Sequence, residues 1–292
     1  MRAVRSWDRA VDVPSVTGMT SIKGKVVAIT GGARGIGLAT ATALHALGAR
    51  VAIGDIDDVT LKESATTLGI DAYAKLDVTD EESFDGFLNY VEETLGPIDA
   101  LVNNAGIMPV GRLVDEPAAV TRRILDINVL GVITGSKLAA QRMVPRGRGH
   151  VINVASLAGE IYAPGIATYC ASKFAVVGFT DAARVEHRGT GVDFSLVMPS
   201  FVNTELTAGT HGVAGVKNAE PTDIASAIVG LILKPRPRVR TTRLAGALSA
   251  SQKFIPRRVA EALNRALGGD SVFTDDVDAE QRKSYEDRAR ND

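Results

Sequence analysis

Tyr169 and Lys173 are the residues whose types and spacing best suit chemistry. They lie four positions apart in the stretch 167–185, whose pattern predicts a helix, and side chains four apart share one helix face. A tyrosine with a pKa near 10 is a poor base at neutral pH, but a fixed ammonium beside it favours the phenolate. We interpret the pair as a candidate proton-transfer site, although such a pair by itself is usually a solvated helix face.

A glycine-rich turn lies more than a hundred residues upstream, at positions 30–37, with the sequence Thr-Gly-Gly-Ala-Arg-Gly-Ile-Gly. It follows the short β-branched run 26–29 and opens a helix-compatible stretch, so the context is strand, turn and helix. In that context Gly31 permits the tight turn, Gly35 lets the backbone approach a pyrophosphate, and Gly37 lets the helix pack closely on the sheet. The turn therefore predicts a dinucleotide-binding site.

The choice between NAD and NADP rests on two side chains of opposite charge. Asp55 ends the second predicted strand, 18 positions beyond Gly37, where a carboxylate accepts hydrogen bonds from the adenosine ribose and repels a 2′-phosphate. Arg34, inside the glycine turn, could instead pair with such a phosphate, which leaves NADP open. We give Asp55 more weight because the strand end aims it at the ribose, whereas nearby Asp57 is more simply a helix cap.

The composition argues against several other kinds of function. The chain has 292 residues, 45% hydrophobic and 23% charged, which is ordinary for one large α/β domain. A net charge of −1 gives no sign of nucleic-acid binding, and four scattered histidines without a cysteine partner predict no metal site. The single cysteine, Cys170, fits a reducing compartment, and no apolar run is long enough to span a membrane. We expect a cytoplasmic protein.

Strand-like apolar runs alternate with helical patterns from about residue 25 to residue 233. This alternation predicts repeated βαβ units. We expect an α/β fold with a Rossmann-type, doubly wound parallel sheet in three αβα layers, forming a single domain over residues 21–233. The expected strands are 26–30, 51–55, 72–76, 100–103, 151–155 and 192–197.

The two ends of the chain differ from this domain. Residues 1–20 lack periodicity and look like an appendage, with Met19 as an alternative start. Residues 234–269 form a basic extension, with a last short strand expected at 238–242, and residues 270–292 look like an acidic, flexible tail.

The basic extension predicts an amphipathic helix, which Gly268 and Gly269 would end. Its apolar positions recur four residues apart at Ile255, Val259, Leu263 and Leu267. The helix could pack as a lid near the substrate mouth, or segment 234–267 could lie on an anionic membrane surface. We favour the lid because Glu261 and Asn264 interrupt the surface.

Further motifs stand in a fixed order between the glycine turn and the end of the domain. They are Asp77-Val78, Asn-Asn-Ala-Gly at 103–106, Asn128, Ser156 thirteen residues before Tyr169, and the segment 199–204. With these motifs the chain resembles the classical short-chain dehydrogenase/reductase family over residues 24–233.

The resemblance implies hydride transfer between a carbinol carbon and the nicotinamide ring, with four catalytic residues. Tyr169 would protonate the carbonyl oxygen or deprotonate the alcohol, and Ser156 would hydrogen-bond the same oxygen. Lys173 would hold the nicotinamide ribose and lower the pKa of Tyr169, and Asn128 would hold a water that joins Lys173 to solvent.

The resemblance also implies a set of cofactor contacts and a homodimer or homotetramer. One departure is Ser200, which stands where the family usually has glycine, so a positive φ there would be costlier. The expected cofactor-binding residues are Gly31, Arg34, Gly35, Ile36, Gly37, Asp55, Asp77, Val78, Asn104, Ala105, Gly106, Tyr169, Lys173, Pro199, Val202 and Thr204.

The leading interpretation is an NAD-dependent oxidoreductase for apolar alcohols or ketones, because the loop 206–216 offers small and aliphatic side chains. The alternatives are an NADP-dependent ketone reductase and a non-catalytic cofactor-binding sensor or scaffold. A third hypothesis, an electrostatic membrane or nucleic-acid binder, rests only on the cations between positions 234 and 258.

Overall fold

The structure is a computed structural model that describes residues 21–210, 218–241, 257–266 and 271–291. The expected appendage at 1–20 lies outside these residues, as do Ile255 and Leu267 of the expected amphipathic helix.

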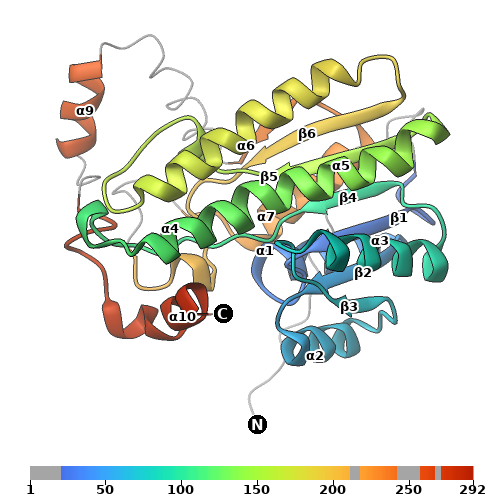
Figure 1. The fold of residues 1–292 in the computed structure, drawn as a ribbon, viewed down its shortest axis with the longest axis horizontal. Helices are drawn as coiled ribbons and strands as arrows, with labels where there is room; N and C mark the ends of the chain where they lie inside the picture. Colours follow the sequence, from blue (N-terminus) through green and yellow to red (C-terminus); the bar gives the residue numbers. More distant parts are fainter. Residues whose placement is uncertain (1–20, 211–217, 242–256, 267–270, 292) are drawn as a thin grey trace.

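The core of the chain is a seven-stranded parallel sheet in the order β3-β2-β1-β4-β5-β6-β7 (Figure 1). Its central strands are buried on both faces, as continuous apolar runs such as Val-Val-Ala-Ile in β1 require. The predicted fold class is confirmed, and so is the short last strand after residue 237. The strands are β1 Val26–Thr30, β2 Arg50–Asp55, β3 Tyr73–Lys75, β4 Ala100–Asn103, β5 Gly149–Val154, β6 Val192–Met198 and β7 Arg238–Arg240.

Helices cover both faces of the sheet and make three layers. One hydrophobic cluster packs α1, α2 and α7 against one face, and a second packs α3, α5 and α6 against the other (Figure 1). The α-helices are α1 Gly35–Ala46, α2 Asp58–Leu68, α3 Glu81–Leu95, α4 Ala118–Leu125, α5 Gly131–Met143, α6 Ala167–Glu186, α7 Pro221–Leu233, α9 Arg257–Ala266 and α10 Ala279–Asn291. The shorter elements are the π-helix η2 Asp126–Leu130 and the 3-10 helices η1 Leu113–Asp115, η3 Val144–Arg146, η4 Leu157–Gly159 and η5 Glu205–Thr207.

The order in which strands are added to the sheet reverses at β1, because β2 and β3 lie on one side of β1 and β4 to β7 lie on the other. Ligands of doubly wound sheets bind at this point, in the crevice beyond the carboxyl ends of the strands. The glycine turn leaves β1 at this end of the sheet.

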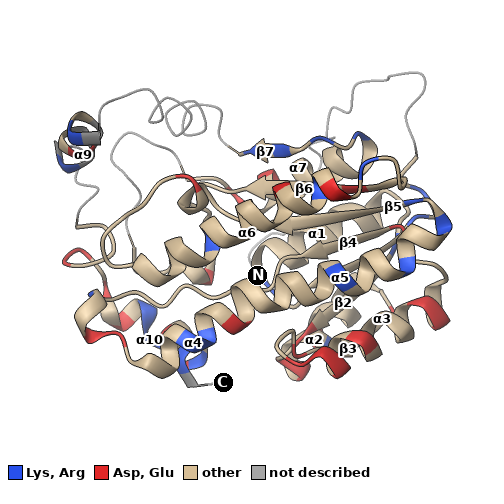
Figure 2. Cartoon of the chain, turned by 45° about the horizontal axis from the view of Figure 1, so that its top comes forward, with Lys and Arg blue, Asp and Glu red and all other residues tan. Residues whose placement is uncertain are grey.

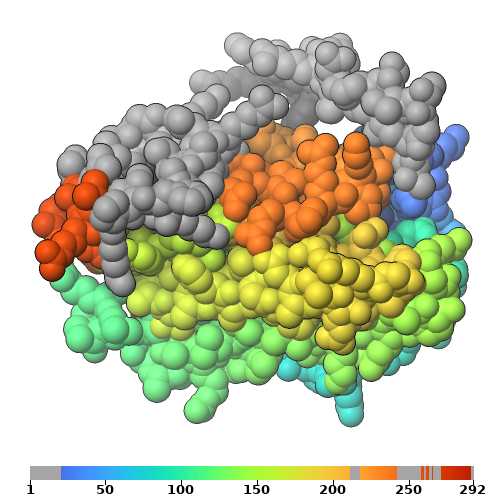
Figure 3. Space-filling view, turned by 90° about the horizontal axis from the view of Figure 1, so that it is seen from above, coloured from blue at the N-terminus to red at the C-terminus, as the bar shows by residue number. Residues whose placement is uncertain are grey.

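Part of the positive charge of the basic extension is neutralised by ion pairs within the protein. Arg238 and Arg240 of β7 both bind Glu160, and Arg238 also binds Asp181 of α6. Figure 2 shows Lys and Arg of β7 in blue, and Figure 3 shows α7 and β7 packed against α6 and β6. Two cations that favoured an electrostatic membrane or nucleic-acid binder are therefore neutralised within the fold.

The described part of the amphipathic helix is α9, which stands apart from the sheet in Figures 1 and 2. Its Glu261 accepts a hydrogen bond from the Tyr162 hydroxyl at 3.3 Å, whereas Val259 is exposed. Among the described residues, no helix is both long and apolar enough to cross a bilayer.

Residues 271–291 differ from the expected flexible acidic tail. They form a turn and then α10, and Figures 1 and 2 both place α10 beside α4. Val272 and Phe273 are buried, and so is Arg282. The acidic composition of this segment favoured a flexible tail. Its composition could not show that these side chains are buried, because their burial depends on loops far away in the sequence.

Candidate active site

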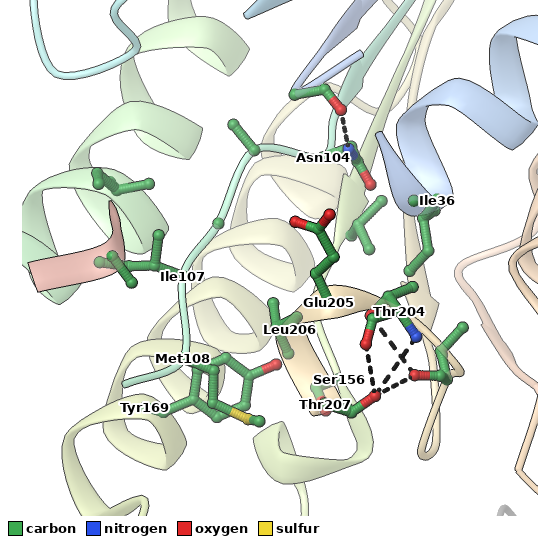
Figure 4. Close-up of a pocket in the computed structure, with 18 of the residues that line it drawn as sticks. Ile36, Asn104, Ile107, Met108, Ser156, Tyr169, Thr204, Glu205, Leu206 and Thr207 are labelled. Atoms are coloured by element: carbon green, nitrogen blue, oxygen red, sulfur yellow. Dashed lines mark hydrogen bonds between the residues drawn. The ribbon is translucent and has the colours of Figure 1, made fainter. Parts of the chain in front are cut away.

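A cavity of about 930 Å³ opens at the carboxyl ends of the central strands. It runs from the glycine turn to Tyr169, and Figure 4 shows Ile36 and Asn104 in the same cavity as Ser156 and Tyr169. The structure thus brings the expected cofactor and catalytic residues to one continuous cavity, except Gly37 and Asn128, which do not line it.

Steric constraints explain the glycine turn. Gly31 and Gly35 have φ values of +64° and +53°, which favour glycine. A Cβ on Gly37 would lie 2.0 Å from the Gly31 carbonyl oxygen, so the first turn of α1 packs on the preceding backbone only without a side chain. Gly35 and Ile36 then line the cavity at the amino end of α1, where peptide dipoles favour a bound phosphate.

Asn104 and Ala105 brace this turn from β4. The Asn104 side chain donates to the carbonyl oxygens of Thr30 and Gly31, at 3.0 Å each, and Thr30 Oγ1 accepts from the amides of Asn104 and Ala105. Asn104 therefore holds the turn through its side chain, and Thr30 contributes to the same contact. The position of Asn104 in the sequence motif did not reveal this structural role.

The adenosine end carries the two residues on which the choice of cofactor was expected to depend. Asp55 lines the cavity and accepts hydrogen bonds from the amides of Ala33 and Asp57. Arg34 is bound to Asp57 Oδ2 at 2.6 Å and to Thr60 Oγ1 at 2.5 Å. The amide of Thr60, followed by Arg34, lowers the pKa of Asp57 to about 2, so this pair is charged at neutral pH.

Asp77 and Val78, which are expected to contact the adenine, line the cavity next to Leu76. Asp77 Oδ1 accepts hydrogen bonds from the amide and the hydroxyl of Thr79, which fixes the turn before α3. Val78 is buried, and a Cβ on Gly131 of α5 would lie 3.0 Å from its side chain.

Asn128 lies in the π-helix between α4 and α5. Its Oδ1 accepts from the Ile107 amide at 2.8 Å, and its Nδ2 donates to the Ile107 carbonyl at 2.8 Å and to Ser172 Oγ at 3.1 Å. A Cβ on Gly106 would lie 3.1 Å from Asn128 Oδ1 and 3.6 Å from Lys173 Nζ. Glycine at 106 therefore keeps Asn128 and Lys173 close to one backbone segment.

Ser156 and Tyr169 meet at the substrate end. Ser156 follows β5, and its Oγ accepts from the Ala158 amide at 3.1 Å; its hydroxyl acts to lower the pKa of Tyr169. Lys173 is buried one turn along α6, with Nζ donating to the Val154 carbonyl at 3.0 Å and lying 5.6 Å from the Tyr169 ring centre. Two hydroxyls and an ammonium thus converge on the cavity.

The pKa of Tyr169 moves against the expectation that Lys173 lowers it. Burial raises this pKa above its ordinary value, and the hydrogen bond from Ser156 offsets only part of the rise. Burial also lowers the pKa of Lys173 to about 8, because desolvation disfavours the ammonium. Without a bound cofactor, Tyr169 is therefore a protonated phenol, poised to donate rather than to accept a proton.

Segment 199–204 crosses the cavity from β6 toward the glycine turn. The Pro199 carbonyl accepts from the Leu157 amide at 2.9 Å, and buried Val202 pairs with Ala219. Thr204 caps η5, and its Cγ2 would lie 3.4 Å from a Cβ on Gly35. Pro199, Val202 and Thr204 all line the cavity, as does Ser200, where the family usually has glycine.

Sequence reasoning missed the residues of the carboxyl-terminal segment that line this cavity. Their signal was faint: two adjacent apolar residues in an acidic stretch, then one tyrosine among charges. Within the described residues, no three His, Cys, Asp or Glu side chains are grouped to hold a metal ion. The missed lining residues are Val272, Phe273, Tyr285, Arg288 and Ala289.

Comparison with known proteins agrees with this geometry. A family model described as short chain dehydrogenase matches residues 25–212. The chain belongs to this family of oxidoreductases, as the motifs predicted.

Individual relatives show the same relationship. The "Probable oxidoreductase EphD" of Mycobacterium tuberculosis (strain ATCC 25618 / H37Rv) is 34% identical over 80% of this chain and 43% of that protein. The chain thus spans less than half the length of this relative. The "2-(S)-hydroxypropyl-CoM dehydrogenase 3" of Xanthobacter autotrophicus (strain ATCC BAA-1158 / Py2) is 39% identical over 63% of this chain and 73% of that protein. A short chain dehydrogenase/reductase from Burkholderia phymatum, solved in complex with NAD, superposes with a TM-score of 0.75 at 26% identity, over 81% of this chain and 95% of that one.

Proposed function

We propose that this protein transfers a hydride between NAD(H) and an apolar alcohol or ketone, with Tyr169 as the general acid and base. One observation carries the proposal: Ser156, Tyr169 and buried Lys173 border the same cavity as the glycine turn. A reacting carbonyl oxygen there would meet two hydroxyl donors, the arrangement that stabilises a developing oxyanion.

The residues would divide the work by their positions. The nicotinamide cofactor supplies or accepts the hydride when it is bound. Tyr169 donates its proton to the carbonyl oxygen during reduction, which requires the protonated phenol that its raised pKa maintains at neutral pH. Ser156 holds that oxygen, Lys173 holds the cofactor ribose, and Asn128 fixes the backbone of Ile107 beside them.

For oxidation, Tyr169 must lose its proton first. Its pKa must therefore fall when the cofactor binds, and the positive charge of oxidised nicotinamide acts in that direction. In this proposal, Lys173 contributes to this fall once the ribose orders its ammonium.

NAD is preferred over NADP in this proposal, for two reasons. Asp55 would meet a 2′-phosphate with a like charge. Arg34, the cation that could pair with this phosphate, is instead bound to Asp57. Titration of Asp55→Ala with both cofactors tests the first reason, and we expect the preference for NAD to narrow or invert.

A screen of alcohols and ketones with NAD(H) and NADP(H), followed by nicotinamide absorbance, tests the activity. We expect NAD-dependent turnover of at least one apolar secondary alcohol or its ketone. Cofactor binding without turnover of any substrate would instead support a sensor or scaffold. NADP preferred by tenfold would make Arg34 the deciding residue and overturn the cofactor assignment.

We also propose that the protein forms a homo-oligomer through the face where η2 meets α6. Leu130 and Phe174 are 54% and 44% exposed on these elements, and burying such side chains is favourable. Light scattering of the wild type and of Phe174→Glu tests this, with dissociation expected for the variant. A monomeric wild type would contradict it.

A further inference from the structure

The carboxyl-terminal segment, residues 271–291, packs on the substrate end of the cavity. Buried Val272 and Phe273 share one hydrophobic cluster with Met108, Ile166 and Tyr169. The Phe201 and Phe273 rings stack with centres 5.4 Å apart and planes 9° apart. The segment therefore contributes apolar side chains directly beside the proposed proton donor.

Two glycines let the segment approach this closely. A Cβ on Gly165, before α6, would lie 2.2 Å from the Phe273 carbonyl oxygen, and one on Gly209, after η5, would lie 2.4 Å from the Asp278 carbonyl oxygen. Both glycines have positive φ values, +81° and +68°. The Asp278 amide also donates to the Gly209 carbonyl at 2.8 Å.

Arg282 fixes α10 to the loops around the site. Its side chain is 1% exposed, a rare degree of burial for arginine. The guanidinium donates to the carbonyl oxygens of Met108, Leu206 and Ala208, and binds Glu286 at 2.6 Å. One buried cation thus joins α10 to the β4 loop and to the loop that would close over the nicotinamide.

Tyr285 extends from α10 into the cavity. Its hydroxyl accepts a hydrogen bond from the Met108 amide at 2.8 Å, and its ring lies 4.8 Å from the Arg282 guanidinium. Figure 4 shows Met108 directly beside Tyr169. Met108 therefore links the two tyrosines, and Tyr285 faces the space that the apolar part of a substrate would occupy.

We propose that Phe273 and Tyr285 are substrate-specificity residues, which form an aromatic wall beside Tyr169 and select uncharged, apolar alcohols or ketones by size. Arg282 is the positioning residue that holds this wall in register with residues 206–208. The effect of the wall on turnover rests on the proposed function, whereas its effect on ligand binding does not.

Activity against short to long methyl ketones tests the wall in Phe273→Ala and Tyr285→Ala. Each variant should gain about tenfold in kcat/KM for the bulkier ketones relative to the short ones, because removing a ring opens room worth one or two methylenes. The affinity for NADH should stay within about twofold, since Phe273 and Tyr285 lie at the substrate end.

Two control variants isolate the wall from general damage. Lys283→Ala removes an exposed side chain of the same helix, and Tyr90→Phe removes a hydroxyl that is bonded to the Asp71 carbonyl far from the site. Both should keep the wild-type order of substrates. A size profile that is the same in the wild type and both wall variants would overturn the proposal.

A binding measurement separates this inference from the proposed function. Unreactive amides of graded size should raise the melting temperature of the NADH complex, and the wall variants should shift the preference toward larger amides. If the wild type turns over no ketone, the proposed function fails, but the melting temperatures with the amides still test the wall. If the amides bind alike to all variants, the wall is refuted even in an active enzyme.

Discussion

The two ends of the cavity are built by different means. At the cofactor end, the glycine turn packs on its own strand and is braced by Asn104, so backbone geometry dictates the residue types. At the substrate end, Tyr285 reaches Met108 across 177 positions, and Arg290 reaches the Val110 carbonyl across 180. At the cofactor end, few residue types are tolerated at the positions of the turn. At the substrate end, the structure requires only that segments distant in the sequence pack together. Substrate choice can thus change without disturbing the cofactor site.

The largest effect separates the two phenols of the cavity. Tyr169→Phe should lower kcat by at least about 100-fold, because it removes the group that transfers the proton. The affinity for NADH should change little, since the ring still packs, and stopped-flow turnover with fluorescence titration measures both.

Tyr285→Phe is the matched comparison, because it removes a hydroxyl from the same cavity without touching the proton transfer. We expect a rise in KM of at most about tenfold with kcat nearly unchanged. Equal losses of kcat in the two variants would show that Tyr169 has no special role.

The cofactor end should be the less tolerant of an added methyl group. Gly37→Ala should lower the free energy of unfolding by about 3 kcal/mol and weaken NADH binding, because the new Cβ would collide with the Gly31 carbonyl. Gly86→Ala, on α3 with nothing within 4 Å of the added Cβ, should stabilise by about 0.5–1 kcal/mol. Denaturant unfolding compares them, and equal stabilities would contradict the steric account.

Releasing Arg34 should give a smaller, selective effect. Asp57→Asn keeps the cap of α2 but removes the charge that holds Arg34, so affinity for NADPH should rise by about tenfold. Titration of both cofactors measures it. An unchanged NADPH affinity would mean that Asp55 alone sets the preference.

The smallest effect is a pH dependence of cofactor binding. The ammonium of Lys173 exists below its lowered pKa of about 8 and is lost as the pH rises through that value. NADH should therefore bind several-fold more weakly well above pH 8 than at neutrality, if Lys173 donates to the ribose. Lys173→Met should bind weakly at every pH, and a wild-type affinity independent of pH would remove Lys173 from the cofactor site.

The sequence was informative where chemistry and geometry are local. Apolar runs predicted the strands, and the glycine spacing predicted the turn, because Gly37 packs on the Gly31 carbonyl within the same turn. It was uninformative where burial depends on distant segments. From its sequence, Arg282 would be assigned to the protein surface, because it lies in a highly charged helix. Its burial depends on three carbonyl oxygens that are distant in the sequence, at residues 108, 206 and 208.

The direction of the Tyr169 pKa shows the same division. The four-residue spacing correctly placed Lys173 beside Tyr169 on α6. It could not reveal how deeply Tyr169 is buried, because its burial is completed by Met108, Val272 and Phe273 from outside the helix. Desolvation therefore prevails over the attraction expected from spacing alone.

Both outer strands of the sheet, β3 and β7, are only three residues long. Short strands at the rim, with Lys75 on one and Arg238 and Arg240 on the other, offer little free backbone to a foreign strand. In the described part of the sheet, these rims work against edge-to-edge aggregation and against assembly by sheet extension. Association through helices, such as the proposed contact at η2 and α6, would leave the sheet register of each subunit undisturbed.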